Sequence, residues 1–255
     1  MTATVNGIRL TYSDTGRGVP LLCLHGGMGV DGGALRVPGI LDLATLGVRV
    51  IIPDQRGHGQ SERTNQREYS HGTWAVDAHE LIRSLGLSRV ALLGHSYGGF
   101  LALEYAKRWP ESLSHLVLVA TSAGPVSVQA LNVSTDAELR EHFRSVWPWF
   151  FVGSDKHWPL FETLQFSADA YTAAFTRELP QYDCREQVPG LGVPTLLIVG
   201  TGDPYCAHMK WLAEHLPDAR LCVLDRAGHF PFVEAAELFT QTVGAFVNDS
   251  AHAAV

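Results

Sequence analysis

Short apolar runs alternate with segments of helical periodicity along most of this 255-residue chain. One run, Val-Ala-Leu-Leu, fills residues 90–93, and from Phe100 to Ala106 the apolar residues recur at helical spacing. Comparable runs fill residues 20–24, 48–53, 113–120, 193–199 and 220–224, and further helical patterns fill 73–85, 207–216 and 234–247. Strands that alternate with helices predict an α/β fold with an open, mostly parallel, doubly wound sheet, whose sites lie at the carboxyl ends of the strands.

The N-terminus departs from this parallel pattern. Asn6-Gly7 separates two strand-like segments, residues 2–5 and 9–13. Asn-Gly favours the tight turn of a two-residue hairpin because both positions tolerate a positive φ. We therefore predict an antiparallel hairpin in front of the parallel strands.

The segment from Gly124 to Gly192 interrupts the alternation. It is rich in aromatic and acidic residues, and much of it fits helical spacing. We predict a helical cap (lid) inserted into a single core domain that consists of residues 1–123 and 193–255. The end of the chain, from Asn248, is expected to be a loose tail.

A tight turn joins the apolar run at 90–93 to the helical pattern that follows it. The turn reads Gly94-His95-Ser96-Tyr97-Gly98, which matches G-x-S-x-G. Flanking glycines leave room for a strained serine at the apex, whose hydroxyl then projects from the sheet edge. The pattern alone also fits an ordinary glycine-rich turn, but its place between strand and helix favours Ser96 as a nucleophile.

Partners for this serine follow other strands. His229 comes after the last strand and suits a general base, because the pKa of a free imidazole is near 6.5. Asp203 follows residues 193–199 and is our candidate for the acid that orients His229; Asp225, four residues before the histidine, is the alternative. The backbone N–H groups of Gly27 and Tyr97 are the predicted oxyanion hole.

Three further polar residues follow the strand at 48–53. Asp54, Arg56 and His58 carry groups that are common in catalysis. We interpret Asp54 and Arg56 as residues that hold their loop by hydrogen bonds and an ion pair, since Asp203 already supplies an acid in a better place.

Taken together, these motifs resemble the α/β-hydrolase fold superfamily over essentially the whole chain apart from the cap. Within it, the order of His25-Gly26-Gly27-Met28-Gly29 and Asp54-Gln55-Arg56-Gly57 is similar to the proline iminopeptidase-like group, which usually has proline in place of Met28. The resemblance implies Ser96 as nucleophile, Asp203 as acid and His229 as base.

Composition and charge exclude several other classes of protein. The net charge of −7 and pI near 5.9 disfavour nucleic acid and anionic membranes as partners. We expect no signal peptide, no membrane span and, with four scattered cysteines, a cytoplasmic protein with reduced thiols. We also expect no metal and no organic cofactor, because the histidines lack metal-ligand spacing and the glycine loop at 26–29 lacks P-loop residues. His71, His79, His115, His142 and His215 are expected to be exposed or capping residues.

The leading functional hypothesis is a cofactor-independent serine hydrolase that cleaves a small carboxylic ester, lactone or amide through an acyl-enzyme. Two alternatives stay open: an aminopeptidase that removes N-terminal proline, and a ligand-binding receptor on the same fold. Selectivity is expected to come from the cap, because sites form where an insertion meets a sheet edge. The predicted substrate contacts are Trp147, Trp149, Phe150 and Phe230. Monomer and homodimer both remain possible.

Overall fold

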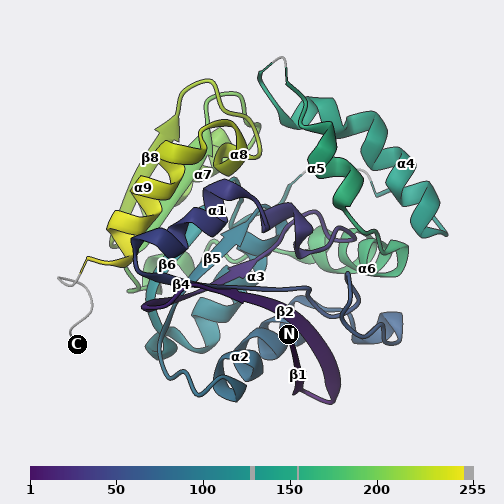
Figure 1. The fold of residues 1–255 in the computed structure, drawn as a ribbon, viewed down its shortest axis with the longest axis horizontal. Coiled ribbons are helices and arrows are strands. Elements are labelled where there is room, and N and C mark those ends of the chain that lie inside the picture. The colour runs from purple at the N-terminus through teal and green to yellow at the C-terminus, as the bar shows by residue number, and fades with distance from the viewer. Residues whose placement is uncertain (127–129, 154, 250–255) are drawn as a thin grey trace.

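An eight-stranded sheet organises the computed structural model, which describes residues 1–126, 130–153 and 155–249 (Figure 1). The strand order is β1-β2-β4-β3-β5-β6-β7-β8. The first two strands pair antiparallel, β2 also pairs antiparallel with β4, and every other pairing is parallel. The bounds are β1 Thr2–Val5, β2 Ile8–Thr15, β3 Val19–Leu24, β4 Val48–Pro53, β5 Val90–His95, β6 Leu113–Val119, β7 Thr195–Gly200 and β8 Ala219–Leu224.

The predicted hairpin joins β1 to β2. Asn6 and Gly7 both have positive φ, 45° and 77°, and Val5 pairs with Ile8 across them. These angles fit a type I′ turn, whose twist matches that of the flanking strands. The predicted mostly parallel sheet with an antiparallel N-terminal hairpin is therefore confirmed.

Helices cover both faces of the sheet, and alternate residues of each central strand point to opposite faces. Leu22 and Leu24 of β3 pack with α2 His71–Ser84, α3 Tyr97–Arg108 and α7 Cys206–His215. Leu21 and Cys23 pack on the other face with α1 Pro38–Leu41 and α9 Ala236–Val247. Because both faces are buried, these strands show continuous apolar runs in the sequence.

The segment between β6 and β7 is helical in the residues that the structure describes. It contains α4 Asp136–Val146, α5 Trp158–Thr163 and α6 Ala168–Ala173, which lie together on one side of the molecule in Figure 1. A capping box opens α4: the hydroxyl of Thr135 accepts from the N–H of Glu138, and the Glu138 carboxylate accepts from Thr135 N. The division into a core and a separate cap domain with bounds at 124 and 192 stays a prediction.

Several local predictions differ from the structure. The helix expected at 234–247 starts at residue 236 as α9, and residue 234 instead ends a separate short helix, α8 Pro231–Glu234, because Ala235 leaves helical geometry with φ −128° and ψ 44°. Short helical turns before β4, such as Gly32–Leu35, had no clear sequence signal. Cys222, whose place in the apolar run at 220–224 predicted a buried side chain, is only half-buried because β8 is an edge strand. The predicted tail beyond residue 249 lies outside the described residues.

Candidate active site

Ser96 forms the apex of a strained turn between β5 and α3. Its φ of 53° and ψ of −118° are unusual for a residue with a side chain, and such geometry costs roughly 1–3 kcal/mol. The surrounding packing enforces it: a Cβ on Gly94 would lie 2.4 Å from the carbonyl oxygen of Gly98, and a Cβ on Gly98 would lie 2.1 Å from that of Leu24. Both glycines of the motif are therefore required sterically, and the serine hydroxyl is held at the sheet edge.

The structure brings three of the predicted residues into one hydrogen-bonded row. The Nε2 atom of His229 lies 2.9 Å from Oγ of Ser96, and its Nδ1 lies 2.6 Å from Oδ2 of Asp203. The other carboxylate oxygen of Asp203 accepts from the backbone N–H of Tyr205 at 2.6 Å. This order of contacts is the one that a serine nucleophile, a base and an orienting acid require.

Asp203, rather than Asp225, is the carboxylate beside the histidine. Asp203 is 4% exposed, whereas the Asp225 side chain is 81% exposed and lies 3.6 Å from Arg226. Burial alone would raise the pKa of the Asp203 carboxyl, but the charge and hydrogen bond of His229, with the Tyr205 N–H, hold that pKa below its usual value. Asp203 is therefore ionised at neutral pH, as an acid that orients an imidazole must be.

The glycine-rich loop after β3 lies against the serine turn. A Cβ on Gly26 would lie 2.7 Å from Cβ of Ser96 and 3.2 Å from the backbone nitrogen of Tyr97. Gly27 follows in the left-handed region with φ 69°. The two segments predicted to supply the oxyanion hole are thus neighbours, and the use of the Gly27 and Tyr97 amides stays a prediction.

Two buried histidines fix the position of this loop through hydrogen bonds to backbone N–H groups. Nε2 of His25 accepts from the backbone N–H of Gln55 at 3.1 Å, and Nε2 of His58 accepts from that of Gly29 at 2.9 Å. Burial lowers the pKa of His58 to about 4, and burial with the nearby His58 lowers that of His25 well below its usual value. Both rings are therefore neutral acceptors at physiological pH.

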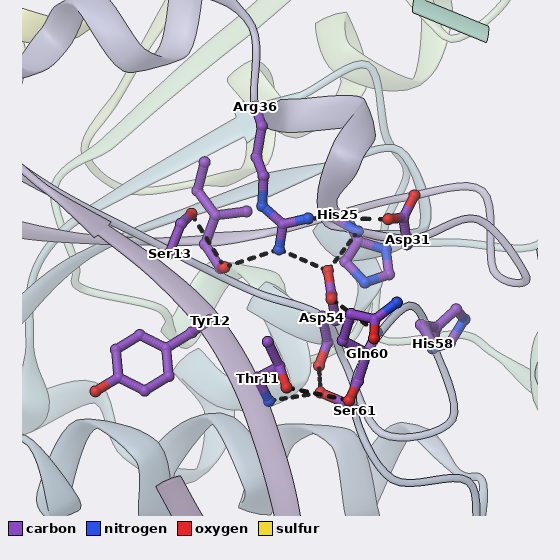
Figure 2. Close-up of polar contacts among 12 residues, drawn as sticks. Thr11, Tyr12, Ser13, His25, Asp31, Arg36, Asp54, His58, Gln60 and Ser61 are labelled. Carbon is purple, nitrogen blue, oxygen red and sulfur yellow. Dashed lines mark hydrogen bonds and ion pairs between the residues drawn. The ribbon is translucent and has the colours of Figure 1, made fainter. Parts of the chain in front are cut away.

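Asp54 is the centre of a second network of hydrogen bonds. Figure 2 shows Asp54 between Arg36 on one side and Gln60 and Ser61 on the other. Its Oδ1 accepts from Arg36 at 2.6 Å, and its Oδ2 accepts from the N–H of Gln60 at 3.0 Å. Arg56 instead binds Asp77 through Nε and Nη2, at 2.7 and 2.8 Å. Asp54 and Arg56 hold their loop through separate ion pairs, as their sequence context indicated.

The predicted substrate contacts occupy different environments. Phe150 is half-buried and its ring stacks on the His229 imidazole, with centroids 5.4 Å apart. Phe230 is 6% exposed and lies among the rings of His95, Trp147 and Phe151. Trp147 is 1% exposed and its Nε1 donates to the carbonyl of Lys156, whereas Trp149 is 85% exposed. Packing against Phe151, Phe161 and Phe230 accounts for Trp147, and Trp149 faces solvent. Within the aromatic segment 147–151, Phe150 is therefore the residue that the structure brings to the histidine.

The histidine predictions are partly wrong. His71 and His115 are buried, at 8% and 1% exposure, rather than exposed. His71 is the first residue of α2 and contacts the rings of Tyr97 and Tyr182, and His115 lies in β6 against Phe246. Among the residues that the structure describes, no group of three His, Cys, Asp or Glu side chains is placed to bind a metal ion, and no helix is long and apolar enough to cross a membrane. The absence of a metal and a cofactor stays a prediction.

Contacts between the cap segment and the loops of the site were not foreseen. The backbone N–H of Ser167 donates to Gly29 at 2.8 Å, and that of Asp31 donates to Gln165 at 3.2 Å. Val30 and Phe166 form an antiparallel bridge between these pairs. The predicted oxyanion loop is thus hydrogen-bonded to a segment more than 130 residues away in sequence, and no local pattern in the sequence indicates such a pairing.

Several known proteins are similar to this chain in sequence or in structure. The sequence model of the alpha/beta hydrolase family matches residues 21–242. An enol-lactonase from Burkholderia xenovorans LB400 superposes with a TM-score of 0.84 at 26% identity, over 98% of this chain and 100% of that one. A 2-hydroxymuconate semialdehyde hydrolase of Pseudomonas sp. (strain CF600) is 29% identical over 98% of this chain and 94% of its own length. Proline iminopeptidase PfmaB of Pestalotiopsis fici is 25% identical over 94% of this chain and 96% of its own, in line with the motif resemblance. The chain belongs to the alpha/beta hydrolase family.

Proposed function

We propose that this protein is a cofactor-independent serine hydrolase that cleaves a small carboxylic ester or lactone through an acyl-enzyme. One observation carries the proposal: the row of hydrogen bonds from Ser96 through His229 to Asp203, with distances of 2.9 and 2.6 Å. A serine hydroxyl is a weak nucleophile by itself, and a base in this position activates it.

The proposed reaction has two halves. Ser96 Oγ attacks the carbonyl carbon while Nε2 of His229 takes the hydroxyl proton, and Asp203 stabilises the resulting imidazolium without being protonated. The amides of Gly27 and Tyr97 bind the oxyanion. Collapse of the tetrahedral intermediate expels the alkoxide, which takes the proton from His229. Water, deprotonated by His229, then attacks the acyl-Ser96 ester. Collapse of this second intermediate releases the carboxylic acid, and Ser96 Oγ takes the proton back from His229.

The acidic side chains of the cap segment bear on the choice between esters and peptides. An enzyme that binds the free amine of an N-terminal proline needs an acidic group available to that amine. Here Asp136 binds Arg63, Glu162 binds Arg140 and Arg144, and Glu178 accepts from the backbone N–H of His71. These carboxylates already have partners, which favours an ester or lactone. The chain is similar to an enol-lactonase and to an esterase from Exiguobacterium antarcticum, each 26% identical, but also to a proline iminopeptidase, 25% identical, so the contacts of these carboxylates carry the choice.

Labelling and turnover of Ser96→Ala test the proposal. Wild-type protein is expected to react with a fluorophosphonate probe and to hydrolyse p-nitrophenyl acetate or butyrate, and Ser96→Ala is expected to do neither. Ser122→Ala is the matched control, because Ser122 also bonds a histidine, 2.9 Å from Nδ1 of His208, but is 1% exposed. A panel that adds lactones and prolyl arylamides ranks the substrate classes. Labelling without turnover would favour the ligand-binding receptor, and labelling that persists in Ser96→Ala would refute the proposal.

A further inference from the structure

Glu234 links the histidine loop to the cap. It ends α8, five residues after His229, and its carboxylate accepts three backbone hydrogen bonds. Oε2 accepts from Gly228 at 2.7 Å, and Oε1 accepts from both Val152 and Gly153 at 2.9 Å. Gly228 directly precedes the histidine, whereas Val152 and Gly153 belong to the segment between α4 and α5. A single side chain therefore joins parts of the chain that are more than 70 residues apart.

The backbone of the same two segments is in direct contact. The N–H of His229 donates to the carbonyl of Phe150 at 2.8 Å. A Cβ on Gly228 would lie 2.4 Å from that carbonyl oxygen, so the two segments pack too closely for any other residue at 228. The Phe150 ring also stacks on the imidazole. His229 is thus hydrogen-bonded through its carbonyl to His95 of β5 and through its N–H to Phe150.

The chemistry of the donors suits a carboxylate in particular. Gly228, Val152 and Gly153 each present an N–H, and an ionised carboxylate is an acceptor at both oxygens. Hydrogen bonds to an ionised acceptor are shorter and stronger than those between neutral groups. A glutamine at this position would keep one acceptor oxygen but would turn an NH₂ group toward one of the N–H donors.

We propose that Glu234 is a positioning residue, which fastens residues 150–153 to the His229 loop and thereby keeps the imidazole within hydrogen-bond reach of Ser96. Glu234 does not touch the reacting atoms and acts through His229. This inference rests on the proposed function, since it assigns a role within the same site. It also makes residues 150–153 part of the support of the base, in addition to any contact with substrate.

Three variants test the proposal: Glu234→Gln, Glu234→Ala and, as control, Glu237→Gln. Glu237 is exposed on α9 and accepts from Gln241, one turn away, at 3.2 Å. Kinetics on a p-nitrophenyl ester are measured per active site, with the sites counted by fluorophosphonate titration, so that loss of folded protein does not count as loss of rate. Misplacing a catalytic group by about 1 Å can cost on the order of 100-fold in rate. We expect kcat to fall roughly 10-fold in Glu234→Gln and roughly 100-fold in Glu234→Ala, with KM within about twofold of wild type and Glu237→Gln unchanged.

Hydrogen exchange of the backbone amides provides a readout independent of turnover. The amides of residues 150–153 and 228–229 are expected to exchange faster in both Glu234 variants. If exchange accelerates but kcat is unchanged, the link exists without positioning the base, and the proposal is wrong. It is equally wrong if KM rises while kcat holds, or if neither quantity moves. Should Glu234→Ala fail to fold, Glu234→Gln decides. Failure of the proposed function would give a different result: the wild-type protein would neither be labelled at Ser96 nor hydrolyse the ester.

Discussion

Replacing Asp203 by asparagine keeps the size of the side chain and removes its charge. The carboxylate lies 2.6 Å from Nδ1 of His229, is 4% exposed, and has its second oxygen occupied by Tyr205 N. An asparagine can turn its NH₂ group toward Nδ1, which leaves the ring proton on Nε2, where it faces Ser96. The imidazole then cannot take the serine proton. The loss of this orientation and of the charge that stabilises the imidazolium is expected to lower kcat by about 10⁴-fold, or about 5 kcal/mol in the activation free energy.

The assay compares Asp203→Asn with Asp225→Asn on the same p-nitrophenyl ester. Asp225 is the closer carboxylate in sequence but is 81% exposed and lies beside Arg226, so its variant is expected to stay within about twofold of wild type. Circular dichroism and thermal unfolding confirm that both variants fold. A larger loss in Asp225→Asn, or an Asp203→Asn enzyme within tenfold of wild type, would refute the assignment of Asp203 as the orienting acid.

Three further predictions concern the substrate pocket, pH and metals. Phe150→Ala is expected to change the ratio of kcat/KM between octanoate and acetate p-nitrophenyl esters by about tenfold, because a lost apolar contact is worth roughly 1–3 kcal/mol. Trp149 is exposed, so Trp149→Ala should keep the wild-type ratio. Burial lowers the pKa values of His58 and His71 to about 4 and that of His95 to about 3, so the unfolded chain binds more protons below pH 6.5. Stability is then complete above that pH and is lost as pH falls toward 4. Urea denaturation should show that the free energy of unfolding falls by about 1 kcal/mol for each of these histidines between pH 7.5 and 5.5. The total loss should be about 1 kcal/mol smaller in His58→Gln and unchanged in the variant of an exposed histidine, His215→Gln. A free energy of unfolding that does not change with pH would contradict neutral buried rings. Dialysis against a strong chelator should leave ester hydrolysis intact, and a loss restored by zinc or manganese would contradict the metal-free prediction.

The sheet and the members of the site could be predicted from the sequence because each depends on a local signal. Buried parallel strands show continuous apolar runs, so the central strands were placed to within about two residues. Ser96 and Asp203 follow such strands, His229 follows the parallel edge strand β8, and the carboxyl ends of parallel strands meet at one edge. Their convergence therefore needed no knowledge of the strand order, which the sequence did not reveal.

Other features depend on contacts between distant segments and had no local signal. The break at Ala235 places Glu234 at the end of α8, although the sequence pattern assigned residue 234 to the start of the helix at 234–247. His71 and His115 are polar in isolation, and aromatic neighbours from other elements bury them. The sequence does not distinguish Trp147, Trp149 and Phe150, because all three are large aromatic residues in one short segment. Their exposures differ because tertiary packing buries Trp147, half-buries Phe150 and leaves Trp149 in solvent.

The helical segment between β6 and β7 is attached to the site at two places that serve different parts of the proposed chemistry. Residues 165–167 are hydrogen-bonded to residues 29–31, in the loop expected to provide one oxyanion donor. Residues 150–153 are hydrogen-bonded to the His229 loop, directly and through Glu234. A segment that only covered an already formed site would not need backbone hydrogen bonds to the loop at residues 29–31 and to the His229 loop. Because preorganised donors and a fixed base contribute to rate rather than to binding alone, the geometry of this segment is expected to influence kcat as well as substrate choice.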